Sequence, residues 1–305
     1  MNNTLPASFT HGSANERYVV AAERVFDGTR VLEQHAVAVS GDRIAAVAPV
    51  DRLRDTGRLI RFAGTLLPGF IDLHAHLLFD QTPQETILRH GLTTVRDTGG
   101  PLVPPSGGDG RLRVLGAGPI LTAPGGYPIP VFGGHDIACE VPDVQTARAA
   151  VGQHVAGGAA LIKDPIPHDL VARAAAAGVR VVSTLDTQSH CTGVANNARQ
   201  LVEAGILLLY GTDLAHTDVP WGIDAQELLL MLHAAHGALT PLDVLSAATA
   251  RAGEHLGLAP LGQLVEGAPA DFIGVRGNPL ERFKLLEYPD LVVSGGVTIV
   301  APVEH

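Results

Sequence analysis

The sequence predicts an α/β fold, in which an incomplete α/β barrel lies beside a small β-sandwich domain built from both ends of the chain. Two features of the sequence lead to this prediction. Apolar runs alternate with alanine-rich, helix-like stretches through the middle of the chain, whereas both ends carry short β-like runs with hairpin turns. A chain of 305 residues is also long enough for one large domain with a buried core and a smaller companion.

The two ends of the chain have the alternation and the turn residues of β-structure. Residues 18–61 contain two strand-like runs, and the pair Asp27-Gly28 sits where a hairpin turn is expected. Residues 270–280 and 291–302 are strand candidates at the other end. Because these segments flank a middle of a different kind, we expect both ends to join in one β-domain. The expected boundaries are 17–62 and 264–303 for the β-domain and 63–263 for the α/β barrel domain.

The middle of the chain predicts a parallel sheet with crossover helices. Apolar runs read as strands at Thr65–Leu73, Leu92–Asp97, Leu112–Ala117, Ala159–Lys163, Val179–Leu185 and Ile206–Asp213. Helices are expected at Asp143–Ala156, His168–Ala177, Ala195–Ala204, Ala225–His236 and Pro241–Leu256. Right-handed crossovers curl such a sheet toward a (β/α) TIM-like barrel. The span from residue 67 to residue 262 is about fifty residues short of a complete eight-stranded barrel, so we expect an incomplete one.

The composition excludes several classes of protein. The chain carries 31 acidic and 21 basic residues without a basic run, which argues against nucleic acid as a partner. Its polar start lacks a signal-peptide core, and its apolar runs are too short to span a membrane. Two cysteines cannot build a disulfide framework, so we expect a cytoplasmic protein. Fourteen histidines favour metal chemistry.

The most informative stretch is LLPGFIDLHAHLLFD, which contains His74 and His76. Residues two apart on a strand share a face, so the two imidazoles are expected side by side. They lie at the carboxyl end of an apolar strand that follows a Pro-Gly turn, an arrangement typical of metal ligands. The alternative is that one or both histidines only form a polar rim.

Lys163 and Asp213 also end apolar runs, ALIK and ILLLYGTD. A lysine at such a position is costly unless it is paired or chemically changed, although its side chain can also extend to solvent. Asp213 could instead cap the segment that follows it. Together with the two histidines, these residues end three predicted strands and are expected to form one convergent site.

These motifs resemble the amidohydrolase superfamily, and within it the imidazolonepropionase-like and prolidase-like branch. The matching text is LLPGFIDLHAHLL, HGLTTVRDTGG, ALIK, YGTD and the tail LTPLDVLSAATARAGEHLGLAPLGQLVEGAPADFIGVRGNPL. The resemblance implies that His74 and His76 bind metal and that Lys163 can be carboxylated and ligate it. It also implies that Asp213 ligates metal and takes the proton from the attacking water.

The sequence departs from this superfamily after Lys163. Members have two further histidine ligands, which end the fifth and sixth barrel strands, and the run from Lys163 to Thr187 leaves room for neither strand. The resemblance implies that the remaining ligands surround one metal of the pair. We therefore expect one divalent ion per chain, zinc in preference to manganese or iron. An open flank near residues 163–180 would invite cover by another subunit, giving a homo-oligomer.

Three further residues are expected near the site. Asp97 and His216 are expected to orient the metal ligands without binding the metal themselves. His216 is also the nearest replacement for a missing histidine ligand. His135, in the loop sequence GGYPIPVFGGHD, is expected to contact either substrate or solvent.

The predicted function is that of a metal-dependent hydrolase that cleaves carbon–nitrogen bonds in a small amide by metal-activated water. Both non-peptide and dipeptide-like amides are compatible with this prediction. The alternatives are an inactive relative that acts as a binding or assembly protein, and a truncated chain without native function. Metal content distinguishes the active hydrolase from the inactive relative.

Overall fold

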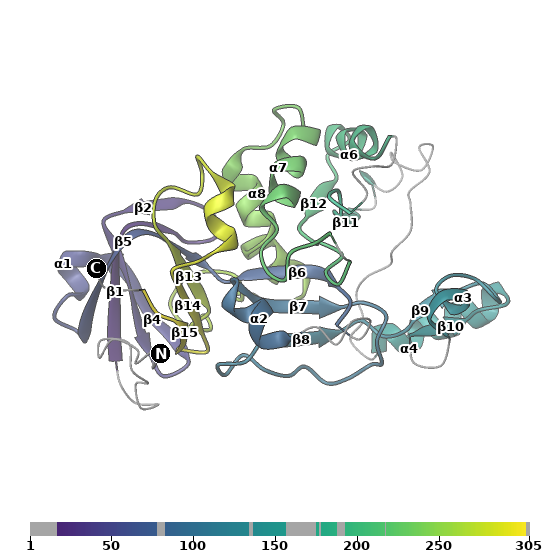
Figure 1. The fold of residues 1–305 in the computed structure, drawn as a ribbon, viewed down its shortest axis with the longest axis horizontal. Coiled ribbons are helices and arrows are strands. Elements are labelled where there is room, and N and C mark those ends of the chain that lie inside the picture. The colour runs from purple at the N-terminus through teal and green to yellow at the C-terminus, as the bar shows by residue number, and fades with distance from the viewer. Residues whose placement is uncertain are drawn as a thin grey trace.

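The structure is a computed structural model that describes residues 17–77, 83–133, 137–156, 175–176, 178–187, 193–216 and 218–302. Strands from both ends of the chain form a β-domain, at the left of Figure 1. Its strands are β1 (Arg17–Phe26), β2 (Val31–Glu33), β3 (His35–Ser40), β4 (Arg43–Pro49), β5 (Arg58–Pro68), β13 (Phe272–Val275), β14 (Leu291–Ser294) and β15 (Val297–Val300). A single turn of helix, α1 (Val50–Leu53), follows β4.

The β-domain is built on one mixed eight-stranded sheet in the order β15-β14-β13-β5-β1-β3-β4, with β2 paired to β1. The predicted union of the two ends is confirmed, because β5 pairs parallel with β1 on one side and antiparallel with β13 on the other. Its apolar cluster combines Val20 and Val37 from the first part of the chain with Phe272 and Val293 from the last. β-branched and aromatic side chains suit such a pleated, buried face. The domain boundaries themselves stay a prediction.

One predicted strand, Thr65–Leu73, is two strands in the structure. β5 ends at Pro68 in the β-domain, and β6 (Phe70–Ala75) begins the α/β region. Gly69 between them is packed so closely that an added Cβ would lie 2.2 Å from Thr93 Oγ1. The apolar run continues through this break because both strands are buried, and only the Pro68-Gly69 turn marks it in the sequence.

The α/β region contains parallel strands whose carboxyl ends point the same way. β6, β7 (Leu92–Asp97) and β8 (Arg113–Gly116) form one parallel sheet, and β11 (Arg180–Val182) pairs parallel with β12 (Leu207–Leu209). Leu73 N donates to Tyr210 O at 3.2 Å, and His76 N donates to Leu214 O at 2.9 Å. These bonds place the segment that follows β12 beside β6.

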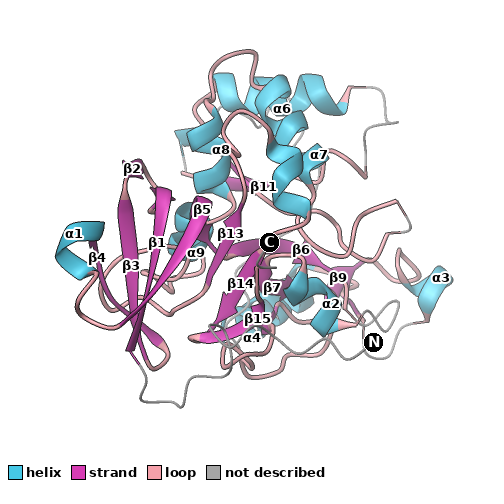
Figure 2. Ribbon diagram, turned by 60° about the vertical axis from the view of Figure 1, so that its left-hand side comes forward, coloured by secondary structure: helices cyan, strands magenta, loops and turns pink. Residues whose placement is uncertain are grey.

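Helices accompany these strands: α2 (Gln84–Arg89), α4 (Val144–Ala156), α6 (Val194–Glu203), α7 (Ala225–Ala234), α8 (Pro241–Ala247) and α9 (Ala250–His255). Figure 2 shows α6, α7 and α8 together on one side of β6 and β11. Leu228 and Met231 of α7, three positions apart and therefore on one face, are completely buried in the main core. None of the described helices is long and apolar enough to cross a membrane.

The strands described in the α/β region form separate sheets and not a closed barrel, which agrees with the predicted incomplete barrel. The outer edge of β8 is paired antiparallel with Ser106, which exchanges two backbone hydrogen bonds with Val114. The predicted strand Ala159–Lys163 and most of both the predicted helix His168–Ala177 and the expected flank near residues 163–180 lie outside the described residues.

A small additional unit was not predicted. β9 (Ile120–Thr122) pairs parallel with β10 (Ala138–Glu140), and α3 (Ile129–Phe132) lies between them in sequence, at the right of Figure 1. The sequence predicted a loop here, in GGYPIPVFGGHD. Proline in the first turn is nevertheless compatible with a helix, since the amide hydrogens there have no partner within the helix.

Glu227, in the first turn of α7, is a fully buried carboxyl group. Its Oε2 accepts a hydrogen bond from Asp186 N at 2.8 Å. Burial raises the pKa of Glu227 to about 8, more than the hydrogen bonds from Ser183 and Asp186 lower it. The nearby N-cap residue Asp224 has a pKa raised to about 6, also mainly by burial.

Replacing Glu227 by glutamine should change how stability depends on pH. Folding takes up a proton at Glu227 between the ordinary pKa of 4.5 and the folded value of about 8. The free energy of unfolding of the wild type should therefore fall as pH rises through this window. Glu227→Gln should show a shallower fall, measured by urea unfolding at several pH values. An equally steep fall in the variant would contradict the buried-proton assignment.

Candidate metal centre

Three buried side chains meet at the carboxyl end of β6. His74 and His76 lie at the end of this strand, and Asp213 lies four residues beyond the last residue of β12. They are 3%, 5% and 2% exposed, and their ligand-type atoms lie within 4.8 Å of one another. The two chain segments run side by side in the same direction, so their carboxyl ends bring these residues together.

The three side chains converge through single atoms. Asp213 Oδ1 lies 2.8 Å from His76 Nε2 and 3.2 Å from His74 Nε2. The two Nε2 atoms are 3.3 Å apart, and the imidazole rings meet edge to face at 77°. Two ring nitrogens and one carboxylate oxygen therefore face a common point.

The backbone determines which nitrogen of His76 can act as a ligand. Its Nδ1 contacts the carbonyl oxygen of Thr98. A carbonyl oxygen can only accept, so Nδ1 carries the proton and a neutral ring has its lone pair on Nε2. Nε2 and Asp213 Oδ1 then face each other as two acceptors, an arrangement that a cation between them would stabilise.

Asp213 has an unusual backbone conformation. Its φ is 62°, in the left-handed region that residues other than glycine seldom adopt. Asp213 N donates to His74 O at 2.9 Å, and Leu214 N contacts the same oxygen at 3.3 Å. Backbone strain of this kind costs on the order of 1–3 kcal/mol and is typical of functional sites. Here it accompanies the turn that aims the carboxylate at the histidines.

The donor set suits a divalent metal ion. Imidazole nitrogen and carboxylate oxygen are ligands for zinc, and also for manganese or iron. Catalytic zinc commonly has about three protein ligands and an open position. His74, His76 and Asp213 supply that number, and the His76 tautomer set by Thr98 is the one a metal ligand needs.

Two of the other predicted site residues lie beside the triad. Asp97 Oδ1 accepts from Leu77 N at 3.1 Å, directly after the histidine pair. Burial raises the pKa of Asp97, while His76 lowers it. His216 Nε2 lies 3.6 Å from Asp213 Oδ2, with its side chain 57% exposed. Lys163 and His135 lie outside the described residues, so their roles stay predictions.

The groups that hold the three residues in place were not predicted from the sequence. They are Thr98, through its carbonyl, and the pair Asp72 and Thr212. Asp72 could have been noticed, because it shares a strand with His74 and is an acid in an otherwise apolar run. A backbone carbonyl, by contrast, is present in every residue and leaves no mark in the sequence.

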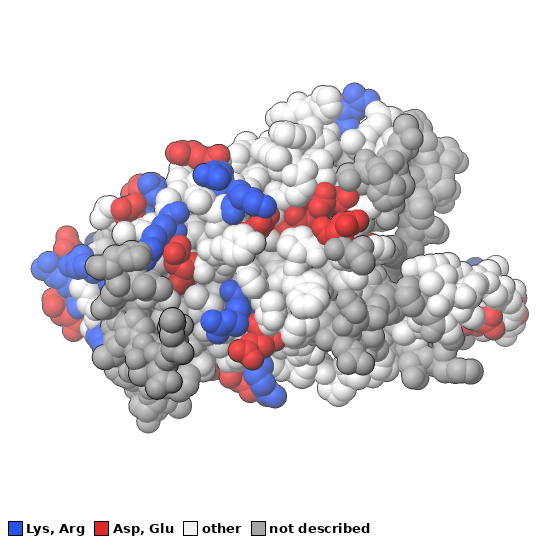
Figure 3. All heavy atoms as spheres, viewed as in Figure 1, with Lys and Arg blue, Asp and Glu red and all other residues white. Residues whose placement is uncertain are grey.

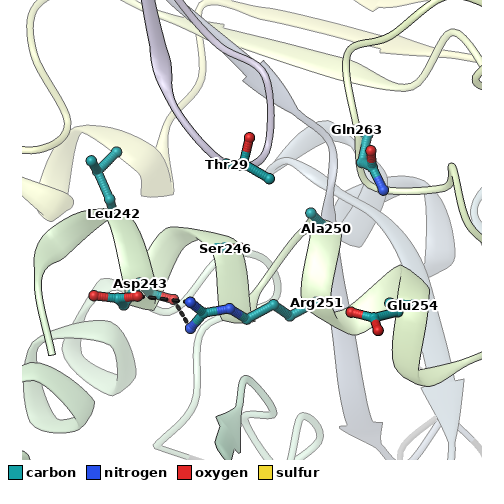
Figure 4. A pocket seen from close by; sticks show the side chains of 8 residues that line it. All are labelled: Thr29, Leu242, Asp243, Ser246, Ala250, Arg251, Glu254 and Gln263. Atoms are coloured by element: carbon teal, nitrogen blue, oxygen red, sulfur yellow. Dashed lines mark hydrogen bonds and ion pairs between the residues drawn. The ribbon is translucent and has the colours of Figure 1, made fainter.

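Two cavities lie away from the triad. One, of about 320 Å³, lies between α8, α9 and the turn at Thr29 (Figure 4). Arg251 on its wall pairs with Asp243 at 2.7 Å. The other, of about 310 Å³, lies between α7 and the short helix η3 (Phe283–Glu287). None of the triad residues lines either cavity, so neither serves as the centre of the candidate site.

The charged surface gives no sign of a polyanion site on the face drawn in Figure 3. Its basic side chains are interspersed with acidic ones and do not gather into one basic area. This agrees with the net charge of -10.

Two known protein families match parts of the chain. Residues 141–299, more than half of it, match the Amidohydrolase family, and residues 18–67 match the NagA composite domain. The chain belongs to the amidohydrolase family.

Curated relatives match parts of the chain. It is 42% identical to ochratoxinase of Aspergillus niger over 93 residues, which are 30% of this chain and 18% of that protein. It is 33% identical to imidazolonepropionase of Deinococcus radiodurans over 149 residues, which are 48% of this chain and 33% of that protein. The chain thus matches a third or less of the length of these relatives.

Solved structures share the fold over nearly the whole chain. The crystal structure of A. niger ochratoxinase has a TM-score of 0.72 at 20% identity and covers 95% of this chain and 97% of that one. A putative prolidase from Bifidobacterium longum has a TM-score of 0.70 at 21% identity and covers 95% and 96%. At these identities the likeness concerns the fold alone.

Proposed function

We propose that this chain is a metal-dependent hydrolase that uses activated water to cleave carbon–nitrogen bonds in small amides, either non-peptide or dipeptide-like. The observation that carries the proposal is the convergence of His74, His76 and Asp213 in a buried site. Membership of the amidohydrolase family supports it, as do the names of the relatives ochratoxinase and imidazolonepropionase.

The residues that would hold the ion are His74 and His76, each through Nε2, and Asp213 through its carboxylate. A carboxylated Lys163 would add a further ligand. A divalent ion in such a site polarises a substrate carbonyl and lowers the pKa of a water that it binds toward neutrality. Burial of all three side chains strengthens electrostatic interactions within the site, because little solvent screens them.

Asp213 is the proposed general base. Its Oδ1 is directed at the two histidines, while Oδ2 lies on the side of His216. That second oxygen would accept the proton of the attacking water as the carbon–oxygen bond forms. It would then return the proton to the leaving nitrogen as the carbon–nitrogen bond breaks. His216 would help to orient Asp213, and Asp97 would hold the backbone that follows His76.

Zinc, at one ion per chain, is the proposed cofactor, with manganese or iron as chemically acceptable replacements. The substrate is proposed to be a small molecule met in the reducing cytoplasm, in keeping with the two cysteines of the chain. Self-association would cover an open barrel flank, since unpaired strand edges attract a partner chain.

Elemental analysis of the purified protein is expected to give one divalent ion per chain. The reason is that one set of ligands converges among the described residues and that the sequence leaves no room for the two further histidines of the superfamily. Two ions per chain would overturn the one-site argument. Absence of metal that cannot be added back would favour an inactive relative.

Substitutions at the triad should separate metal binding from proton transfer. His74→Ala and His76→Ala are each expected to lose both metal and turnover on a panel of N-acyl amino acids, dipeptides and cyclic amides. Asp213→Asn should keep part of the metal but lose turnover about 10²–10⁴-fold, because an amide can ligate weakly but cannot accept a proton.

The matched control is His233→Ala, since His233 is exposed on α7, outside the triad. It should retain the metal and turnover of the wild type. Full turnover in Asp213→Asn would remove Asp213 from the role of general base.

A further inference from the structure

A single buried carboxylate joins the two segments that carry the triad. Asp72 is 0% exposed on β6, two residues before His74. Its Oδ1 accepts from His74 N at 2.8 Å and from Thr212 N at 3.2 Å. Its Oδ2 accepts from the Thr212 hydroxyl at 2.6 Å. Residues 140 positions apart in the sequence are thus joined immediately beside two of the triad residues.

These hydrogen bonds hold the backbone next to Asp213. Asp213 has its φ in the left-handed region, and the residues on either side of it are tied to β6. On one side, Thr212 is held by Asp72 through both its amide and its hydroxyl. On the other side, Leu214 N contacts His74 O. The direction of the Asp213 carboxylate therefore depends on the hydrogen bonds between Thr212 and Asp72 and on the contact of Leu214 N with His74 O.

Overall stability does not explain why a carboxylate is buried here. The flanking residues Phe70, Ile71 and Leu73 are apolar and buried, and a buried carboxylate is costly unless hydrogen bonds compensate it. Replacing both partners of a buried hydrogen bond by apolar groups of the same shape can be nearly neutral or stabilising. An apolar side chain could not, however, accept from Thr212 and His74 together. What Asp72 contributes is a defined geometry.

We propose that Asp72 and Thr212 are positioning residues, a clamp that holds Asp213 against His74 and His76 and so sets the affinity of this site for its metal ion. The inference rests on the proposed function, because it concerns the ion that the triad would bind. Neither residue is among the groups proposed to ligate the ion or to transfer a proton.

The clamp is tested at Thr212 by one substitution that removes the hydroxyl group and one that keeps it. Thr212→Val keeps the branched shape and removes the donor to Asp72, whereas Thr212→Ser keeps the donor. Loss of a group that orients a metal ligand typically weakens metal binding about 10–100-fold. We therefore expect the zinc Kd of the full-length valine variant, measured by competition with a chromophoric chelator, to rise by about that factor. The serine variant should bind zinc as the wild type does.

Thr249→Val is the matched control. Thr249 is also 0% exposed, and its hydroxyl donates to Leu245 O at 2.7 Å, outside the triad and its clamp. This variant loses an equally buried hydroxyl group, so its thermal stability should fall while its zinc Kd stays unchanged. Should Thr212→Val fail to fold, Thr212→Ala replaces it, because it also lacks the hydroxyl donor to Asp72 and places no methyl group against the Asp72 carboxylate. This variant should also bind zinc more weakly.

The outcomes separate the clamp from the proposed function. A wild type that binds no zinc overturns both. A wild type that binds zinc, with Thr212→Val binding it equally well, overturns the clamp alone. The clamp is also overturned if Thr249→Val weakens zinc binding as much as Thr212→Val does. Weaker binding confined to the valine variant at Thr212, with recovery in the serine variant, supports the clamp.

Discussion

The site depends on the parallel alignment of β6 with the segment that follows β12. His74 O accepts from Asp213 N, and His76 N donates to Leu214 O, so this register sets which residue of the last segment faces the two histidines. Because side chains alternate along a strand, a slip of one residue would turn the Asp213 carboxylate away from them. The left-handed backbone at Asp213 and the contacts of Asp72 direct the Asp213 carboxylate at the histidines only when the two segments keep this register.

The β-domain positions the start of β6. β5 passes into β6 through Gly69, whose amide donates to Asp271 O at 3.0 Å. Asp271, which precedes β13, also accepts from Arg113 of β8 at 3.0 Å and from Gly295 N at 2.7 Å. One buried acid from the last part of the chain thus contacts the amino-terminal ends of two barrel strands. The ends of the chain therefore help to place a site whose ligands lie in the middle.

Buried polar groups are concentrated near the site. Most of the core is formed by apolar side chains such as Leu228 and Met231, which stabilise the fold by burial, although acids such as Glu227 and Asp271 are also buried. Around the carboxyl end of β6, Asp72, His74, His76 and Asp213 are all buried close together in space. Such groups cost free energy unless they are hydrogen-bonded or bound to metal. A metal-binding function would explain why the chain bears this cost and why Asp213 keeps its strained backbone conformation.

Local patterns in the sequence were sufficient to predict β7, the helices α6 and α7, and the histidine pair at the end of an apolar strand, because strand and helix periods are set by neighbouring residues. They also identified Asp213, as an acid that ends an apolar run. The tautomer of His76 set by the Thr98 carbonyl and the clamp of Asp72 and Thr212 were decided only by the tertiary structure. Each of these depends on a contact between segments distant in the sequence. A pattern of neighbouring residues holds no record of such contacts.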